Sequence, residues 1–152
     1  MVFYNEKTVK KGYYHVINKD KLRNEKKVLY YRSGLEKKMM EICDHSTSIL
    51  EWSYEDVILE YQLQKDLGTN ITHRYIMDFW VKKRIKGIVK EYLVEIKPYA
   101  LLFPPKVPKR KTKKFLEEVE LYSINLAKWN KAQEFAKSNG ISFVIVTEKA
   151  LS

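Results

Sequence analysis

The sequence has little of what stabilises a secreted or membrane-bound protein. One cysteine, Cys43, stands among 152 residues, so the chain cannot form an internal disulfide or a cysteine-based zinc site. The longest apolar runs, such as residues 141–147, fall far short of the roughly 20 residues that cross a bilayer. Residues 1–11 do not have the apolar stretch of a signal peptide. We therefore expect a protein of the reducing cytoplasm with no membrane contact.

Acidic residues are scarce relative to basic ones. The 19 Asp and Glu residues face 29 Lys and Arg residues, which gives a net charge of +10. Such a surplus favours an anionic partner, most often nucleic acid, because binding releases counterions condensed on phosphates. It is also compatible with a purely solubilising role, and it indicates nothing about catalysis. The three histidines have no metal-binding spacing, which argues against zinc.

The length and the 45% share of hydrophobic residues are typical of one globular domain with a core. Residues 1–32 are basic and rich in tyrosine, so we expect an extended arm that ends in a short strand at 27–31. Residues 33–152 should form the folded body. This begins with a helix that stops by residue 45, because Ser33 and Glu36 match the Ser-x-x-Glu capping pattern and apolar residues follow at helical spacing.

The sequence next predicts three strands, at residues 51–61, 71–81 and 88–97. Polar links at 62–70 and 82–87 separate them. Because links this short join neighbouring antiparallel strands, we expect a meander.

All four prolines lie in residues 98–114, together with six basic residues, and this stretch is expected to be a solvated loop. A helix is predicted over 115–137, with a break near 123–125. The unbroken apolar run 141–147 predicts a strand that is buried on both faces and pairs in parallel. The expected fold class is α/β.

The strand at 88–97 ends in an unusual pair of charged residues. Side chains alternate along a strand, so Glu95 and Lys97 share one face while Val94 and Ile96 point the other way into a core. A carboxylate and an ammonium group thus lie side by side on a strand made otherwise of core residues. One interpretation is a surface salt bridge, worth at most about 1 kcal/mol.

Asp78 favours a second interpretation. It lies in the most apolar part of the meander, where an aspartate is costly unless it is paired or bound to a metal. Across a hairpin, Asp78 and Glu95 can face each other, and two such carboxylates are typical ligands of Mg²⁺. A Mg²⁺ ion held by Asp78, Glu95 and the backbone carbonyl of Ile96 would activate water for phosphodiester hydrolysis. Lys97 would orient that water or stabilise negative charge.

These residues carry a resemblance to a known superfamily. Asp78 followed by Glu95-Ile96-Lys97 resembles the Asp … Glu-x-Lys signature of the PD-(D/E)xK restriction-endonuclease-like superfamily, with Met77 where the superfamily's name has proline. The predicted elements match its αβββαβ core, a mixed sheet flanked by helices. Residues 73–80, 95–98 and 127–132 are similar to TnsA-type transposase endonucleases. Over nearly the whole chain, the sequence is similar to the head completion nucleases of T4-like tailed phages.

The resemblance implies an active site and a function. It assigns catalysis to Glu36, Asp78, Glu95 and Lys97, and a Mg²⁺ or Mn²⁺ ion to the three acids and the Ile96 carbonyl. Glu36 has a rival explanation, because it would complete the capping box with Ser33 in any case. The implied function is a DNA nuclease, an endonuclease or exonuclease, that acts in head completion and head–tail joining by trimming or cutting packaged DNA.

Basic residues are the candidates for contacts with the DNA backbone. They are Lys106, Lys109, Arg110, Lys111, Lys113 and Lys114 in the loop, Arg74 before the Asp78 strand, and Lys128 on the later helix. For Arg74 and Lys128 a surface or packing role is an open alternative. No base-reading pattern accompanies these cations, so little sequence specificity is expected.

Two other functions stay open from the sequence. One is a transposon-type endonuclease subunit, and the other is a DNA-binding connector that keeps the nuclease fold without catalysis. The implied partners are double-stranded DNA and proteins of the phage head, portal or neck. The protein would act in the host cytoplasm during assembly and could stay in the virion head. The sequence leaves the oligomeric state open.

Overall fold

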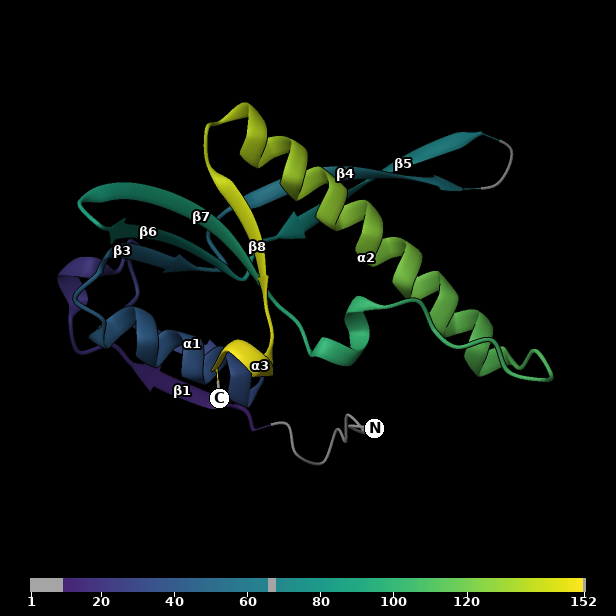
Figure 1. The fold of residues 1–152 in the computed structure, drawn as a ribbon, viewed down its shortest axis with the longest axis horizontal. Coiled ribbons are helices and arrows are strands. Elements are labelled where there is room, and N and C mark those ends of the chain that lie inside the picture. Colours follow the sequence, from purple (N-terminus) through teal and green to yellow (C-terminus); the bar gives the residue numbers. More distant parts are fainter. Residues whose placement is uncertain (1–9, 66–67, 152) are drawn as a thin grey trace.

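The computed structural model describes residues 10–65 and 68–151 (Figure 1). None of the described helices is long and apolar enough to cross a membrane. Besides two short helical turns (Lys19–Lys21 and Tyr99–Leu102), the elements in chain order are β1 (Gly12–His15), β2 (Val28–Tyr31), α1 (Gly34–His45), β3 (Ile49–Tyr54), β4 (Ile58–Lys65), β5 (Thr69–Ile76), β6 (Phe79–Ile85), β7 (Ile88–Ile96), α2 (Lys113–Ser138), β8 (Ser142–Val146) and α3 (Glu148–Leu151).

Four strands form the central sheet, in the order β3-β6-β7-β8. Strands β3, β6 and β7 pair antiparallel, and β8 pairs in parallel with β7, from Tyr92 opposite Ser142 to Ile96 opposite Val146. The predicted meander and parallel last strand are therefore confirmed. The expectation that the last strand is buried on both faces is wrong. Because β8 lies at the edge of the sheet, residues 143–146 are only half-buried.

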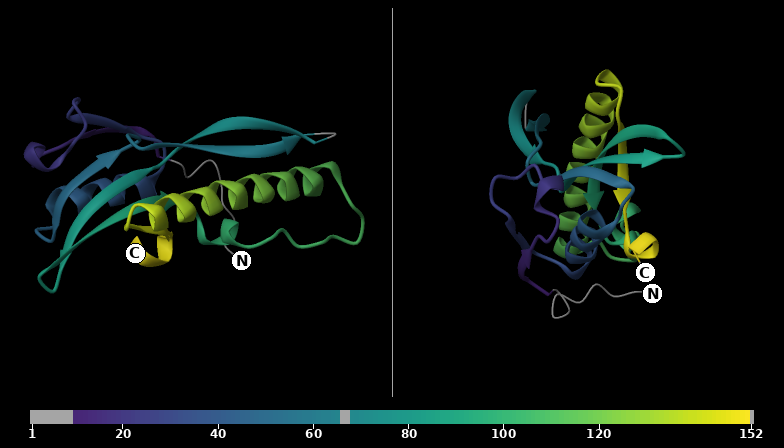
Figure 2. Two further views of the ribbon diagram at one scale, coloured as in Figure 1. Left: turned by 90° about the horizontal axis from the view of Figure 1, so that it is seen from above. Right: turned by 90° about the vertical axis from the view of Figure 1, so that its left-hand side faces the viewer.

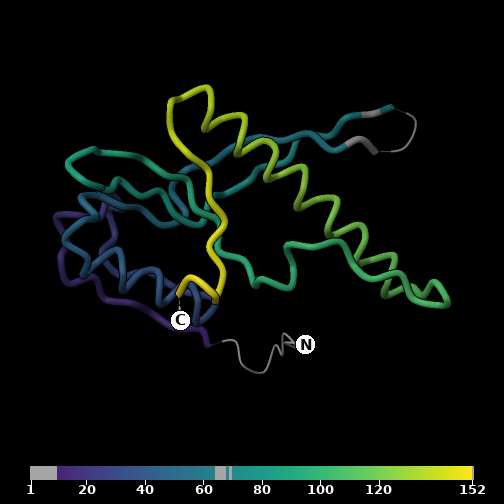
Figure 3. The backbone as a smooth tube through the Cα atoms, in the orientation of Figure 1, coloured from purple at the N-terminus to yellow at the C-terminus, as the bar shows by residue number. Residues whose placement is uncertain are grey.

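The first two predicted strands are each broken by a bend. The first divides into β3 and β4 at Glu55, which has a φ of 50°. The second divides into β5 and β6 beside Asp78, which lies in the bend and not within a strand as predicted. The bends face each other: the Glu55 N–H donates to the Asp78 carbonyl (3.0 Å), and the Met77 N–H donates to the Val57 carbonyl (2.9 Å). The hairpin β4–β5 consequently leaves the central sheet (Figure 3).

The polar links predicted at 62–70 and 82–87 are also wrong, because strand pairing continues through most of both. Strands β4 and β5 pair up to Lys65. Strands β6 and β7 are joined by a two-residue turn of Lys86 and Gly87, whose φ angles are 50° and 79°. Two left-handed residues match the twist of the flanking strands, so pairing persists to the turn.

The two long helices pack on different cores. Met39, Met40 and Cys43 of α1 belong to the core that contains Val94 and Ile96 of the sheet. The core under α2 contains Ala132 and Ala136 together with Leu93 and Trp80. Because Leu93 and Val94 alternate along β7, the two cores lie on opposite faces of the sheet. The hairpin β4–β5 runs alongside α2 (Figure 2).

Helix α1 begins at the predicted cap, Ser33, and α2 begins after a similar cap, Thr112. The Ser33 hydroxyl accepts a hydrogen bond from the Glu36 N–H (3.2 Å), and the Thr112 hydroxyl accepts one from the Phe115 N–H (3.1 Å). Helix α1 ends at His45, as expected. The break predicted at 123–125 is wrong, since α2 is continuous.

The segment predicted to be an extended arm is a hairpin. Strands β1 and β2 pair antiparallel, and Val16, Leu22 and Leu29 pack into the core beneath α1. Burial of these three side chains outweighs the polar composition that favoured an arm. Residues 1–9 lie outside the described part of the chain. The hairpin is therefore part of the folded body.

A buried aspartate fastens this hairpin to α1. Asp44 is fully buried. Its carboxylate accepts hydrogen bonds from the Tyr14 hydroxyl (2.7 Å), the Ile17 N–H (2.9 Å) and the Asn18 N–H (2.8 Å). Three donors satisfy the charge locally, so Asp44 has a structural role.

Candidate active site

The four residues predicted to be catalytic meet at one end of the central sheet. Asp78 lies in the bend before β6, Glu95 is the next-to-last residue of β7, and Lys97 directly follows that strand. Glu36 lies in the first turn of α1. The charges of Glu95, Glu36 and Lys97 all act on Asp78. Residues far apart in the sequence thus form one electrostatic cluster.

Asp78 is held against the end of β7. Its Oδ2 accepts a hydrogen bond from the Ile96 N–H at 2.7 Å. The pKa of Asp78 is raised to about 8, first by burial and then by the carboxylates of Glu95 and Glu36, while the Ile96 amide and Lys97 act against this rise. A carboxyl group in such surroundings gains from a nearby cation.

Glu95 is one of the few buried charged residues, with 7% of its surface exposed. Its Oε2 accepts a hydrogen bond from the Tyr75 hydroxyl at 2.7 Å. The other oxygen, Oε1, lies 3.5 Å from the ammonium nitrogen of Lys97. Glu95 and Lys97 thus form the salt bridge of the first interpretation, but it does not lie at the surface, because their side chains are only 9% and 21% exposed.

Glu36 combines a capping role with a place beside the cluster. Its Oε2 accepts hydrogen bonds from the Arg32 N–H (2.7 Å) and from the Tyr54 hydroxyl (2.9 Å). The first bond is the return half of a cap, although it reaches Arg32 and not Ser33 as the capping box would require. The carboxylate of Glu36 nevertheless acts on Asp78.

Two buried tyrosines that the sequence reasoning missed hold the acids. Tyr54 ends β3 and donates to Glu36, while Tyr75, near the end of β5, donates to Glu95. Burial and the adjoining carboxylate raise the pKa of each phenol well above its ordinary value. Both tyrosines flank the facing bends, so the bends position all three acids. The signal in the sequence was faint: each tyrosine lies within three positions of Glu55 or Asp78.

The donor set fits a hard divalent cation. Mg²⁺ is commonly held by one or two carboxylates, with waters and substrate phosphates completing its coordination. Asp78 and Glu95 are two such carboxylates; Glu95 is buried and Asp78 half-buried, and these surroundings disfavour two unneutralised charges. Among the residues that the structure describes, no group of three or more His, Cys, Asp or Glu side chains could hold a metal ion. The fit consequently rests on this pair and on main-chain oxygen.

The predicted DNA-contacting residues occupy different surroundings. Residues 106–114 are all exposed; residues 106–112 precede α2, while Lys113 and Lys114, predicted to lie in the loop, form the start of that helix. Arg74 is exposed on β5, opposite Glu60. The ammonium nitrogen of Lys128 lies 5.6 Å from the ring centre of Tyr75. Lys128 is therefore separated from Glu95 by a single side chain.

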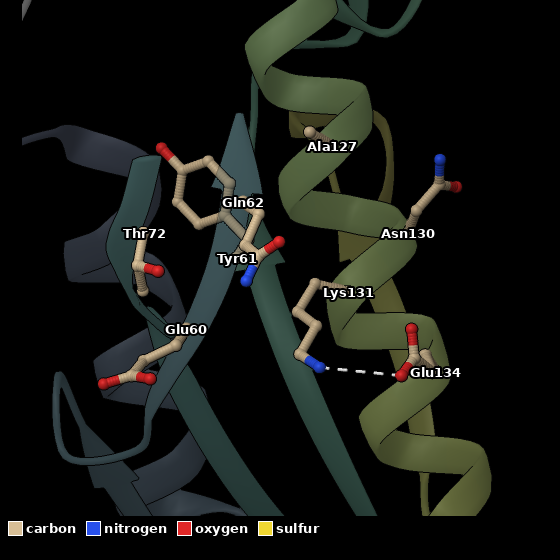
Figure 4. A pocket seen from close by; sticks show the side chains of 8 residues that line it. All are labelled: Glu60, Tyr61, Gln62, Thr72, Ala127, Asn130, Lys131 and Glu134. Carbon is tan, nitrogen blue, oxygen red and sulfur yellow. Dashed lines mark ion pairs between the residues drawn. The ribbon is translucent and has the colours of Figure 1, made fainter. Parts of the chain in front are cut away.

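A cleft of about 490 Å³ lies between the hairpin β4–β5 and α2 (Figure 4). Its hairpin side includes Tyr61, and its helix side includes Lys131, which pairs with Glu134 at 3.5 Å. Tyr61 packs edge-on against Tyr75, with ring centres 6.4 Å apart. The cleft therefore adjoins the acid cluster but does not contain it.

Comparison with known proteins agrees with the fold and gives the family of the chain. The model of the family "TnsA-like endonuclease N terminal" matches residues 46–148, and the chain belongs to this family, whose domain is restriction-endonuclease-like. A curated relative, the head completion nuclease of Enterobacteria phage T4, is 34% identical over 138 residues, which cover 88% of each chain. The expected fold class and superfamily are thus confirmed, and the chain is a nuclease.

Proposed function

We propose that this chain is a metal-dependent deoxyribonuclease that cuts or trims double-stranded DNA during phage head completion. The observation that carries the proposal is the pair of half-buried Asp78 and buried Glu95 beside Lys97, because only a bound cation would make two close carboxylates useful next to a phosphodiester. The relative from phage T4 supports the place of the reaction in head completion.

Asp78, Glu95 and the Ile96 carbonyl would hold Mg²⁺ or Mn²⁺, with Glu36 behind them. When bound, such an ion polarises a phosphodiester and lowers the pKa of water. Tyr75 fixes one oxygen of Glu95, and the Ile96 N–H fixes one oxygen of Asp78, so the remaining oxygens are oriented before substrate arrives.

Lys97 supplies the positive charge of the site. Its ammonium group lies 3.5 Å from Glu95 Oε1 and is only partly exposed. From there it can donate a hydrogen bond to an attacking water or to a phosphate oxygen on which negative charge develops. The exposed cations of residues 106–114 would bind the DNA backbone without reading its bases.

The proposal also includes the place of action and the protein partners. The protein would work in the host cytoplasm on heads whose DNA has been packaged. It would contact head, portal or neck proteins, and could stay with the virion.

The decisive experiment compares two substitutions on one strand. Glu95→Ala should abolish cleavage of circular and linear duplex DNA in Mg²⁺ or Mn²⁺. Glu91→Ala, a matched control opposite Lys82 on the same strand, should cut as the wild type does. Asp78→Ala should be inactive yet still bind DNA. A folded Glu95→Ala protein that cuts at the wild-type rate would refute the proposal. Cleavage of DNA by the wild-type protein in EDTA would refute it as well. Comparing the two substrates also distinguishes internal cuts from end trimming.

A further inference from the structure

A second basic surface lies on the hairpin that joins β6 and β7. Residues 82–90 contain five Lys and Arg side chains and no acid. We call this stretch the β6–β7 tip. It is distinct from residues 106–114, the basic stretch that runs into the start of α2, and the two lie toward opposite sides of the molecule in Figure 1.

Most cations of the tip form no ion pair within the described part of the chain. Lys82 is the exception, because Glu51 lies 3.7 Å from its ammonium nitrogen and Glu91 lies opposite it. No Asp or Glu side chain in residues 10–65 and 68–151 forms an ion pair with the other four, which are Lys83, Arg84, Lys86 and Lys90.

Two of these cations directly oppose each other. Lys83 is paired with Lys90 across the β6–β7 ladder, and like charges placed directly opposite each other destabilise a sheet. Arg84 and Lys86 are exposed nearby. The hairpin thus carries a charge arrangement that its own stability disfavours.

The turn residue is equally unfavourable. Lys86 has a φ of 50° and precedes Gly87 in a two-residue turn. Both central positions of such a turn need positive φ, and asparagine, aspartate or glycine is preferred there. The backbone of Lys86 therefore lies in the left-handed region, which most residues other than glycine avoid. The unfavourable backbone conformation at Lys86 thus occurs at a position where the side chain adds another positive charge to the tip.

An anionic partner accounts for both choices. We propose that the β6–β7 tip binds the phosphate backbone of duplex DNA. The proposal takes from the proposed function only that the anion is DNA. The last residue of the tip, Lys90, lies five residues before Glu95 on β7, which is about 17 Å at the usual rise of a strand. The tip would contact the DNA backbone at a point some distance along the duplex from the phosphodiester that is cut. These contacts would not depend on base sequence.

The test is the salt dependence of DNA binding in EDTA, where no cleavage is needed. Binding of a duplex of about 30 base pairs would be measured over a salt series for the wild type, for Lys86→Asn, and for the triple variant Lys83→Thr, Lys86→Asn, Lys90→Thr. Each lost phosphate contact should reduce the slope of log K against log salt by about 0.9, hence by about 2.7 in the triple variant. Lys38→Asn, an exposed lysine of α1, is the control and should leave the slope unchanged.

Lys86→Asn separates DNA binding from a structural role. Asparagine suits the turn better, so the Tm of this variant should rise while its affinity for DNA falls. An unchanged slope and affinity in the triple variant would overturn the proposal. The proposal would also be overturned if the triple variant bound DNA as the wild type does but no longer bound a poly-glutamate peptide. That result would indicate that the tip binds an acidic protein surface. Absence of cleavage in every metal, with a reduced slope in EDTA, would reject the proposed function and support the tip.

Discussion

Asp44 and Asp78 are both withdrawn from solvent, but their surroundings are opposite in kind. Asp44 accepts three hydrogen bonds and has a tyrosine hydroxyl among its donors. Asp78 accepts one, from Ile96, and has the carboxylates of Glu95 and Glu36 as neighbours. The fold satisfies the first charge and leaves the second in need of a cation. Burial of an acid therefore does not indicate function by itself; the balance of donors against neighbouring charges does.

The largest effect expected from this comparison is on catalysis. Asp78→Asn should lower the cleavage rate about a thousandfold or more, because several kcal/mol of metal-assisted stabilisation depend on this carboxylate. Its free energy of unfolding should not fall. Single-turnover cleavage in Mg²⁺ and urea unfolding in EDTA measure the two quantities.

The matched substitution Asp44→Asn should do the reverse. It should lower the free energy of unfolding by about 3 kcal/mol, since buried donors lose a charged acceptor. Cleavage by the folded fraction should be unaffected. Equal effects of the two substitutions on cleavage would contradict the comparison.

Removing the tyrosine hydroxyls that donate to these acids should give the same contrast between catalysis and stability, with smaller effects. Tyr75→Phe should slow cleavage about tenfold, because the hydrogen bond to Glu95 orients a carboxylate at the site. Tyr14→Phe, which removes the bond to Asp44, should cost about 1.5 kcal/mol of stability and leave the cleavage rate unchanged. Rates and urea midpoints for both variants provide the measurement. Wild-type cleavage by Tyr75→Phe would remove Tyr75 from the site.

The smallest effect is on the pH dependence of stability without metal. Folded Asp78 keeps its proton up to about pH 8, whereas its ordinary pKa is 3.8. The folded state therefore binds more protons between these values, and the stability that Asp78 contributes is lost as pH rises through about 8.

Asp44 should behave in the opposite way. Burial raises its pKa, but hydrogen bonds from Ile17, Tyr14 and Asn18 bring the pKa below the ordinary value. Its contribution is therefore present at neutral pH and is lost as pH falls through the lowered pKa. Urea midpoints in EDTA for the wild type, Asp78→Asn and Asp44→Asn would show these opposite slopes. Parallel slopes in the two variants would contradict them.

The sequence predicted features that depend on local pattern. The cap at Ser33, the shared face of Glu95 and Lys97, and the parallel final strand all follow from spacing that a single element imposes. These features were enough to suggest the acids and the fold class. The place of Asp78 near Glu95 followed from the hairpin between their strands.

The sequence did not predict features that tertiary contacts impose. Strand-like composition continues across Glu55 and Asp78, so the bends leave almost no mark on the alternation of side chains. The bonds from Tyr54 and Tyr75 to the acids join residues 18 and 20 positions apart, and no local rule selects such partners. The N-terminal hairpin was missed for the same reason, because Asp44 satisfies it from another element.

The facing bends also determine at which stage of folding the nuclease site is assembled. Asp78 lies within one bend, and Tyr54 and Tyr75 flank the pair, so the three acids are aligned only after β3 has met β6 and β4 has met β5. The pairing of β3 with β6 is non-local, and pairings of this kind are slow to form because the entropy of loop closure must first be overcome. A nascent or partly unfolded chain therefore carries the acids without their alignment, and destructive activity is confined to the finished molecule.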